Sequence, residues 1–186
     1  MSERRAAAFL DRDGTIITDV EFVSRSEDVR LLSGAAEAIA RLNAARIPVV
    51  VVTNQSGIGR GLFTADDYEV VRARLDALLR AHGATIDATY VCPHHPDFTG
   101  PCECRKPGTL LYRQAAADLG LDPSRSGWVG DRWRDVAPAL AFGGRGILID
   151  GPVTPPEERA QAARDAEVVP SLASAVDRLL GSYWHR

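Results

Sequence analysis

Two acidic residues separated by one position, Asp11 and Asp13, are the first in the chain whose types and spacing could support chemistry. They follow a short apolar stretch, residues 6–10, which we interpret as a strand. Side chains two apart on extended backbone point the same way, so we expect the two carboxylates to converge. Their repulsion would favour a bound divalent cation or a shared proton. An ordinary acidic turn is the alternative, because Gly14 and Thr15 are typical turn residues.

Two further polar segments directly follow predicted strands. The run Thr53-Asn54-Gln55-Ser56 comes after four consecutive valines, and its hydroxyls, amides and backbone N–H groups suit a phosphate or carboxylate. Asp131 ends a later short strand and supplies the third acid that a magnesium ion, which prefers oxygen ligands, would need. A capped turn is the alternative for the first segment, and an N-cap aspartate with a surface partner is the alternative for the second.

Two basic residues, Arg105 and Lys106, precede a predicted helix. The lysine could reach a bound phosphoryl group as a point charge, and the planar fork of the arginine could hold a substrate oxyanion. A solvated basic turn is the alternative for this pair.

The most specific pattern lies in a Cys-rich loop at residues 92–104, which we call the zinc loop after the metal that its residues could bind. Its thiols Cys92, Cys102 and Cys104, together with one imidazole, suit a closed tetrahedral zinc site that leaves no position for catalysis. From spacing alone either His94 or His95 could be the fourth ligand. A flexible loop with unpaired thiols is the alternative.

The elements that position these residues alternate along the chain. We expect strands at residues 6–10, 49–52, 86–91, 126–130 and 146–149, and helices at about 33–45, with Ser33 as N-cap, 64–82, 107–119, 133–142, 157–166 and 171–180. This alternation predicts an α/β fold with a parallel sheet and helices on both faces. Asp11, Thr53 and Asp131 then meet at the carboxyl edge of that sheet.

Composition is that of one ordinary globular domain spanning residues 1–186, with 45% apolar residues and a net charge of −3. We therefore expect neither nucleic acid nor a membrane as partner. The N-terminal segment is too soon acidic for a signal peptide, and three clustered cysteines argue against a disulfide scaffold, so we expect a cytoplasmic location.

Taken together, the motifs resemble the haloacid dehalogenase (HAD) superfamily phosphatases, within them the histidinol-phosphatase-like subfamily III. The closest likeness is to the D-glycero-D-manno-heptose-1,7-bisphosphate 7-phosphatase group. They occur in the family's order over about the first 150 residues: Asp11-x-Asp13-Gly-Thr, Thr53-Asn-Gln-Ser56, Cys92-Pro-His-His-Pro, Cys102-x-Cys104-Arg-Lys-Pro and Gly130-Asp131-x-x-x-Asp135. The resemblance implies a three-layer Rossmann-like fold with a central parallel five-stranded sheet. No large cap domain fits the spacing, so a flap at about residues 14–32 and the zinc loop would border the pocket.

The resemblance also implies residue roles. Asp11 would be the nucleophile and Asp13 the general acid and base. Thr53 and Lys106 would hold the phosphoryl oxygens, and Arg105 would help to recognise the substrate. Magnesium would be bound by Asp11, the main-chain carbonyl of Asp13 and Asp131, and zinc by Cys92, His94, Cys102 and Cys104. The substrate-binding set would include Asp19, Val20, Glu21, Phe22, Asn54, Gln55, Ser56, Arg105 and Arg132.

The activity implied is magnesium-dependent removal of the 7-phosphate of D-glycero-D-manno-heptose 1,7-bisphosphate through an aspartyl-phosphate, by a monomer or weak oligomer acting on a phosphorylated sugar. Histidinol phosphate or another small phosphoester is an alternative substrate. Transfer of the phosphoryl group to another acceptor, and an inactive zinc-stabilised binding module, are further alternatives. Trp133 and Arg134 fall outside the resemblance, and their bulk beside the pocket leaves the substrate open, while the tail at 182–186 carries no signal that we interpret.

Overall fold

Six parallel strands form a single sheet in the computed structural model, which describes residues 4–20 and 22–183. The spatial order is β3-β2-β1-β4-β5-β6, which places β1 in the middle. The strands are β1 (Ala8–Leu10), β2 (Val49–Asn54), β3 (Ala88–Cys92), β4 (Gly127–Gly130), β5 (Arg145–Ile149) and β6 (Glu167–Val169). The predicted α/β class and parallel sheet are confirmed.

The prediction of five strands was wrong by one, because β6 adds a sixth at the edge of the sheet. It pairs with β5 through the register Ile147↔Glu167 to Ile149↔Val169. A segment of three residues is too short to show a hydrophobic period, so only pairing with a neighbouring strand reveals it.

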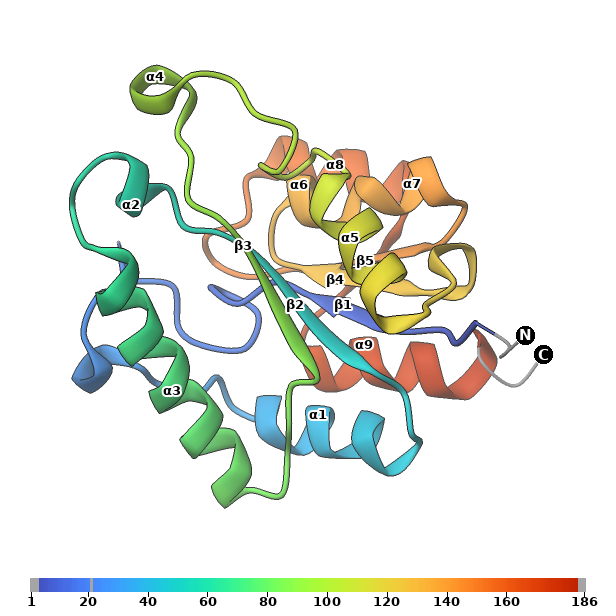
Figure 1. Cartoon of the computed structure of the whole chain (residues 1–186). Helices are drawn as coiled ribbons and strands as arrows, with labels where there is room; N and C mark the ends of the chain where they lie inside the picture. Colours follow the sequence, from blue (N-terminus) through green and yellow to red (C-terminus); the bar gives the residue numbers. More distant parts are fainter. Residues whose placement is uncertain (1–3, 21, 184–186) are drawn as a thin grey trace.

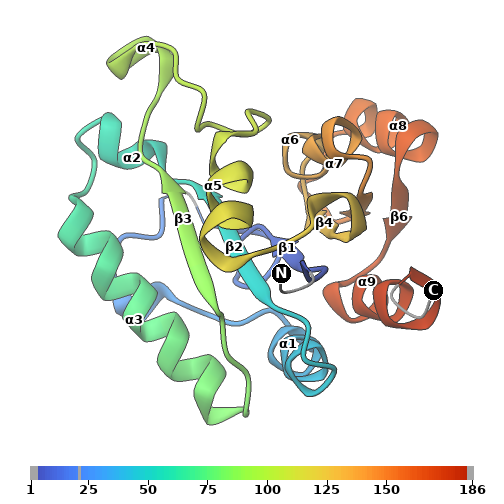
Figure 2. The ribbon, with the colours of Figure 1, turned by 45° about the vertical axis from the view of Figure 1, so that its right-hand side comes forward.

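Helices cover both faces of the sheet (Figures 1 and 2). One face carries α1 (Ala35–Ala44), α3 (Ala65–Ala81) and α9 (Leu172–Arg178). The other carries α5 (Leu110–Leu119), α6 (Trp133–Val136), α7 (Pro138–Phe142) and α8 (Pro156–Asp165). The valines of β2 are divided between the two cores, since alternate side chains point to opposite faces. This explains why that strand is apolar without alternation.

Three predicted helices differ in detail. The single helix expected at 133–142 is divided into α6 and α7, because Pro138 has no N–H to donate and instead begins a new helix. Gly34, with φ of 76°, occupies the N-cap position of α1 that we had given to Ser33. The last helix passes after Arg178 into a π-helical turn, Leu179–Tyr183. By contrast, α3 begins after Thr64, which forms a capping box with Asp67.

Aromatic packing supports the middle of the sheet directly beneath the end of β1. The ring of Phe9 lies 4.9 Å from that of Trp128 on β4 and 5.3 Å from that of Tyr112 on α5. Phe142 stacks on Trp128 at 5.4 Å. These contacts fix β1 and β4 relative to α5, and therefore fix the three backbone segments from which the polar residues emerge.

Two irregular segments border the carboxyl edge of the sheet. The flap holds a 3-10 turn at Ser26–Asp28 and is anchored by Ile16, Ile17, Val23 and Val29, which are buried in the core. The turn α2 (Ser56–Gly59) contacts the zinc loop, where Gly59 N donates to Pro93 O at 2.9 Å, and the loop itself contains α4 (Pro96–Thr99). Among the helices described in residues 4–20 and 22–183, none is long and apolar enough to cross a membrane.

Candidate active site

A polar cavity of about 440 Å³ opens at the carboxyl edge of the sheet, where β1, β2 and β4 end. The loop before α5 and the flap complete its walls. Its lining residues are Asp11, Arg12, Asp13, Asp19, Val20, Phe22, Val23, Asn54, Gln55, Ser56, Lys106, Asp131, Arg132 and Arg134. Most of the predicted substrate-binding and catalytic residues are therefore gathered at one place.

Lys106 is buried at the floor of this cavity. Its Nζ donates to Asp11 Oδ1 at 2.7 Å and to the main-chain oxygen of Val52 at 2.7 Å, and it lies 2.8 Å from Asp135 Oδ1. Burial acts to lower the pKa of Lys106, but the charges of Asp11 and Asp135 together outweigh it and raise that pKa above its ordinary value. The lysine therefore remains a cation and holds one oxygen of Asp11 in place.

Three carboxylates, those of Asp11, Asp131 and Asp135, present oxygens that all lie within 4.8 Å of one another. Asp131 Oδ2 is buried and has no hydrogen-bond partner in the part of the chain that the structure describes. Burial first, and then the charges of Asp11 and Asp135, raise the pKa of Asp131 to about 8. Gly14 permits this approach, since a Cβ there would lie 2.3 Å from Asp131 Oδ2. A buried group of mutually repelling carboxylates fits a divalent cation.

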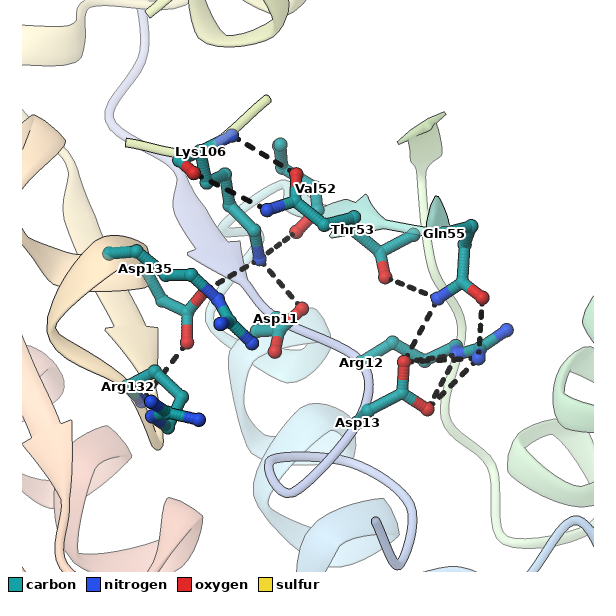
Figure 3. A network of polar contacts seen from close by, with 11 residues as sticks. Asp11, Arg12, Asp13, Val52, Thr53, Gln55, Lys106, Arg132 and Asp135 are labelled. Atoms are coloured by element: carbon teal, nitrogen blue, oxygen red, sulfur yellow. Dashed lines mark hydrogen bonds and ion pairs between the residues drawn. The ribbon is translucent and has the colours of Figure 1, made fainter. Parts of the chain in front are cut away.

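Asp13 does not join this group, so the expected convergence of its carboxylate with that of Asp11 was wrong. Its oxygens accept hydrogen bonds from Arg12, at 2.9 Å for the shortest, and from Gln55 Nε2 at 2.9 Å (Figure 3). The two carboxylates do not converge because the backbone between them is not extended: the chain bends at Arg12, immediately after β1 ends. The role of its main-chain carbonyl toward magnesium stays a prediction.

The end of β2 supports the residues around it. Thr53 Oγ1, which is buried, accepts from Gln55 Nε2 at 2.8 Å, so Gln55 joins Thr53 to Asp13. Asn54 Oδ1 accepts from the backbone N of Lys106 at 3.0 Å, which fixes the loop that carries the lysine. Asn54 is thus positioned for structural support as well as for contact with a ligand.

The flap and the zinc loop meet over Arg60. Its guanidinium lies 5.0 Å from the ring centre of Phe22 in the flap and 5.5 Å from that of Phe98 in the zinc loop. Asp19, Val20 and Phe22 line the cavity as predicted, and Glu21 lies outside the described residues. Cation–π contacts of this kind hold two separate segments beside the same opening.

Two arginines predicted to face the substrate have protein partners. Arg132 Nη2 lies 2.6 Å from Glu158 Oε1 on α8, although Arg132 still lines the cavity. Arg105 Nη1 donates to the main-chain oxygen of His94 at 3.2 Å and is not among the cavity-lining residues. Its role in substrate recognition stays a prediction.

The cysteine cluster forms as the spacing predicted. Cys104 Sγ lies 3.0 Å from Cys92 Sγ, 3.4 Å from Cys102 Sγ and 3.1 Å from His94 Nδ1. Ligand atoms around a tetrahedral zinc with these donors are separated by about 3.5–3.8 Å, given Zn–S and Zn–N bonds of about 2.3 and 2.0 Å. The distances from Cys92 Sγ to Cys102 Sγ, 3.7 Å, and to His94 Nδ1, 3.9 Å, are close to this range, and those at Cys104 Sγ are shorter. The structure places His94 in the cluster, whereas His95 Nδ1 accepts from the backbone N of Asp97. These four residues fit a zinc ion.

Three residues of the site received no role from the sequence. Asp135 appeared only as the last residue of the motif Gly130-Asp131-x-x-x-Asp135. Its position about one helical turn after Asp131 is the signal that could have placed it near that residue. Arg134 was noted only for its bulk beside the pocket. Arg12 gave no signal, because an isolated arginine is an ordinary surface residue until the fold brings it to a cavity.

Comparison with known proteins agrees with this geometry. Residues 6–136 match the family described as polynucleotide kinase 3 phosphatase, and residues 103–175 match the HAD-hydrolase-like family. The D-glycero-beta-D-manno-heptose-1,7-bisphosphate 7-phosphatase of Rhodopseudomonas palustris is 40% identical over 80% of this chain and 85% of its own. That of Escherichia coli K12 is 36% identical over 86% and 88%, respectively.

Solved structures give the same result. The D,D-heptose 1,7-bisphosphate phosphatase of B. bronchiseptica, complexed with magnesium and phosphate, superposes with a TM-score of 0.84 at 34% identity, over 94% of this chain and 98% of that one. The corresponding enzyme of Burkholderia thailandensis has a TM-score of 0.69 at 31% identity, over 96% and 100%. The chain therefore belongs to the heptose-1,7-bisphosphate 7-phosphatase family of HAD-like phosphatases.

Proposed function

We propose that this protein hydrolyses the 7-phosphate of D-glycero-beta-D-manno-heptose 1,7-bisphosphate and releases the 1-phosphate. The observation that carries the proposal is the pair formed by Asp11 and Lys106 at the floor of an open polar cavity, in a chain of this family. A buried lysine that fixes one carboxylate oxygen prepares the other oxygen for attack on phosphorus.

In the first step, Asp11 attacks the phosphorus of the 7-phosphate. Lys106 holds Oδ1, and the other carboxylate oxygen, Oδ2, is the one to which we assign the new bond. The bond between phosphorus and the sugar oxygen breaks, and its electron pair stays on that oxygen. Asp13 then supplies a proton to it, which requires Asp13 to exchange part of its contact with Arg12 or Gln55 for the substrate.

In the second step, the aspartyl-phosphate is hydrolysed. Asp13 accepts a proton from a water molecule, whose oxygen bonds to phosphorus as the bond to Asp11 breaks. Lys106 and the hydroxyl of Thr53 would donate to the phosphoryl oxygens, on which negative charge develops. Inorganic phosphate leaves, and both aspartates return to their starting forms.

Magnesium is the metal that we assign to the acidic group. Asp11, the main-chain carbonyl of Asp13 and Asp131 would hold it, and the unpartnered buried oxygen of Asp131 supports this assignment. When bound, the ion offsets the repulsion between an anionic nucleophile and an anionic substrate.

Zinc is the metal that we assign to the loop. The cluster of Cys92, His94, Cys102 and Cys104 leaves no open coordination position, so the ion would hold the loop folded beside the cavity rather than act on the substrate. Reduced, clustered thiols also support our proposal of a cytoplasmic enzyme.

The experiment that tests the function is phosphate release in the presence of Mg²⁺ over a substrate panel. The panel contains both anomers of heptose 1,7-bisphosphate, histidinol phosphate and common sugar monophosphates. We expect the beta bisphosphate to have the highest kcat/KM and the product to be the 1-phosphate. Preference for histidinol phosphate, or equal and weak activity on every compound, would overturn the substrate assignment.

A further inference from the structure

Among the residues that the structure describes, four cationic side chains line the cavity, and three of them lie within hydrogen-bond distance of a carboxylate oxygen. Arg12 is paired with Asp13, Lys106 with Asp11 and Asp135, and Arg132 with Glu158. Arg134 is the fourth cation. Its Nε lies 4.0 Å from Asp135 Oδ1, beyond hydrogen-bond distance, and that oxygen is already 2.8 Å from Lys106 Nζ.

The position of Arg134 leaves its charge available to a ligand. Nε is buried and has no hydrogen-bond partner in the described chain, while the side chain as a whole is 41% exposed. The side chain of Lys106 is only 1% exposed. Lys106 therefore lies at the floor of the cavity beside Asp11, and Arg134 lies nearer to its mouth.

The backbone around Arg134 is held rigidly. Glu158 accepts from the backbone N of Trp133 at 2.5 Å as well as from the side chain of Arg132. Asp135 Oδ2 accepts from the backbone N of Arg132 at 3.0 Å. The first turn of α6 is therefore fixed from two sides, which lowers the entropy cost of using an arginine there for recognition.

We propose that Arg134 binds the anionic group of the substrate that is not transferred, which in a sugar bisphosphate is the second phosphate. This inference rests on the proposed function. A bisphosphate brings two groups of about −1.5 to −2 charge each at pH 7, and the first is placed over Asp11 and Lys106. The guanidinium is a planar fork that matches a second phosphate at the mouth of the cavity.

The test compares two substrates that differ only in the second phosphate. Heptose 1,7-bisphosphate and heptose 7-phosphate are assayed with the wild type, Arg134→Gln and Arg134→Lys. Arg113→Gln, which changes an exposed arginine on α5 outside the cavity, is the matched control. We expect Arg134→Gln to lower the ratio of kcat/KM for the bisphosphate to that for the 7-phosphate by about 10- to 100-fold, mainly through KM.

The outcomes separate this inference from the proposed function. If Arg134→Gln leaves the ratio of kcat/KM for the bisphosphate to that for the 7-phosphate unchanged, even with an equal loss of activity on both substrates, the role of Arg134 is overturned. The proposed function still stands in that case, provided that the wild type prefers the bisphosphate. A wild type that hydrolyses both compounds equally overturns the proposed function, and the inference with it. If Arg134→Gln does not fold, Arg134→Lys carries the test, because a lysine cannot make the bidentate contact. For Arg134→Lys, the ratio of kcat/KM for the bisphosphate to that for the 7-phosphate is expected to fall at least about threefold, and an unchanged ratio overturns the inference.

Discussion

Replacing Asp131 by asparagine is expected to stabilise the protein in the absence of magnesium, and to do so more strongly as the pH rises. Asp131 is 3% exposed, and its Oδ2 has no hydrogen-bond partner among the described residues. Burial, followed by the charges of Asp11 and Asp135, raises its pKa from 3.8 to about 8. Asparagine has nearly the same shape but never carries the charge that makes this burial unfavourable.

The direction in which stability changes with pH follows from the number of protons bound by the folded and unfolded states. Because the pKa is higher in the folded protein, the native state keeps a proton between about pH 4 and pH 8 that the unfolded state has released. The stability of the wild type therefore falls as the pH rises through that window, at about 1.4 kcal/mol per pH unit from this group. Between pH 5 and pH 8, the advantage of Asp131→Asn over the wild type should grow by about 4 kcal/mol at most.

The measurement is urea unfolding at pH 5, 6, 7 and 8 without added Mg²⁺, followed by tryptophan fluorescence, since Trp128 is fully buried. Asp66→Asn, at an exposed aspartate in the first turn of α3, is the matched control. The difference between its free energy of unfolding and that of the wild type should be nearly the same at every pH. Saturating Mg²⁺ at pH 8 should stabilise the wild type and not Asp131→Asn.

The prediction is refuted if the free energies of unfolding of the wild type and Asp131→Asn differ by no more than about 0.5 kcal/mol from pH 5 to pH 8. A difference of that size is usual for surface substitutions. The prediction is also refuted if the variant is the less stable protein at pH 8 without Mg²⁺. Either result would mean that the carboxylate of Asp131 is already satisfied in the metal-free protein.

Three other changes give distinct expected results. Asp11→Asn should lower kcat by at least about 10³-fold, because the nucleophile is lost. The thermal unfolding transition should be retained, because Lys106 keeps its contact with Asp135. Substantial residual turnover would contradict the assignment of Asp11 as nucleophile. Metal analysis should find about one zinc per chain in the wild type and little in Cys104→Ser, and a folded, active, zinc-free wild type would contradict the structural site. Arg60→Ala should raise KM about 2- to 10-fold with little change in kcat. The reason is that the variant loses two cation–π contacts of about 0.5–1 kcal/mol each, one to the flap and one to the zinc loop. A variant with the kinetics of the wild type would show that these contacts do not affect substrate binding.

Local patterns in the sequence were enough to predict the frame of the molecule. Four valines without alternation indicated a strand covered on both faces, and all four are buried in β2. The ends of predicted parallel strands share one edge of a sheet, so the sequence alone could place Asp11, Thr53 and Asp131 near one another. The cysteine spacing likewise predicted a cluster that forms. Each of these inferences depends on residues close together in the chain, or on the regular geometry of parallel sheets.

Only the tertiary structure decided the contacts that depend on how irregular segments pack. Asp13 turns to Arg12 and Gln55 because the chain bends after β1. Asp135 pairs with Lys106, a partner that its spacing from Asp131 does not identify. Which arginine of the cavity has no carboxylate within hydrogen-bond distance among the described residues depended on α8 bringing Glu158 to Arg132. Such pairings join residues far apart in the chain, and their geometry follows from packing of the whole core rather than from any local period.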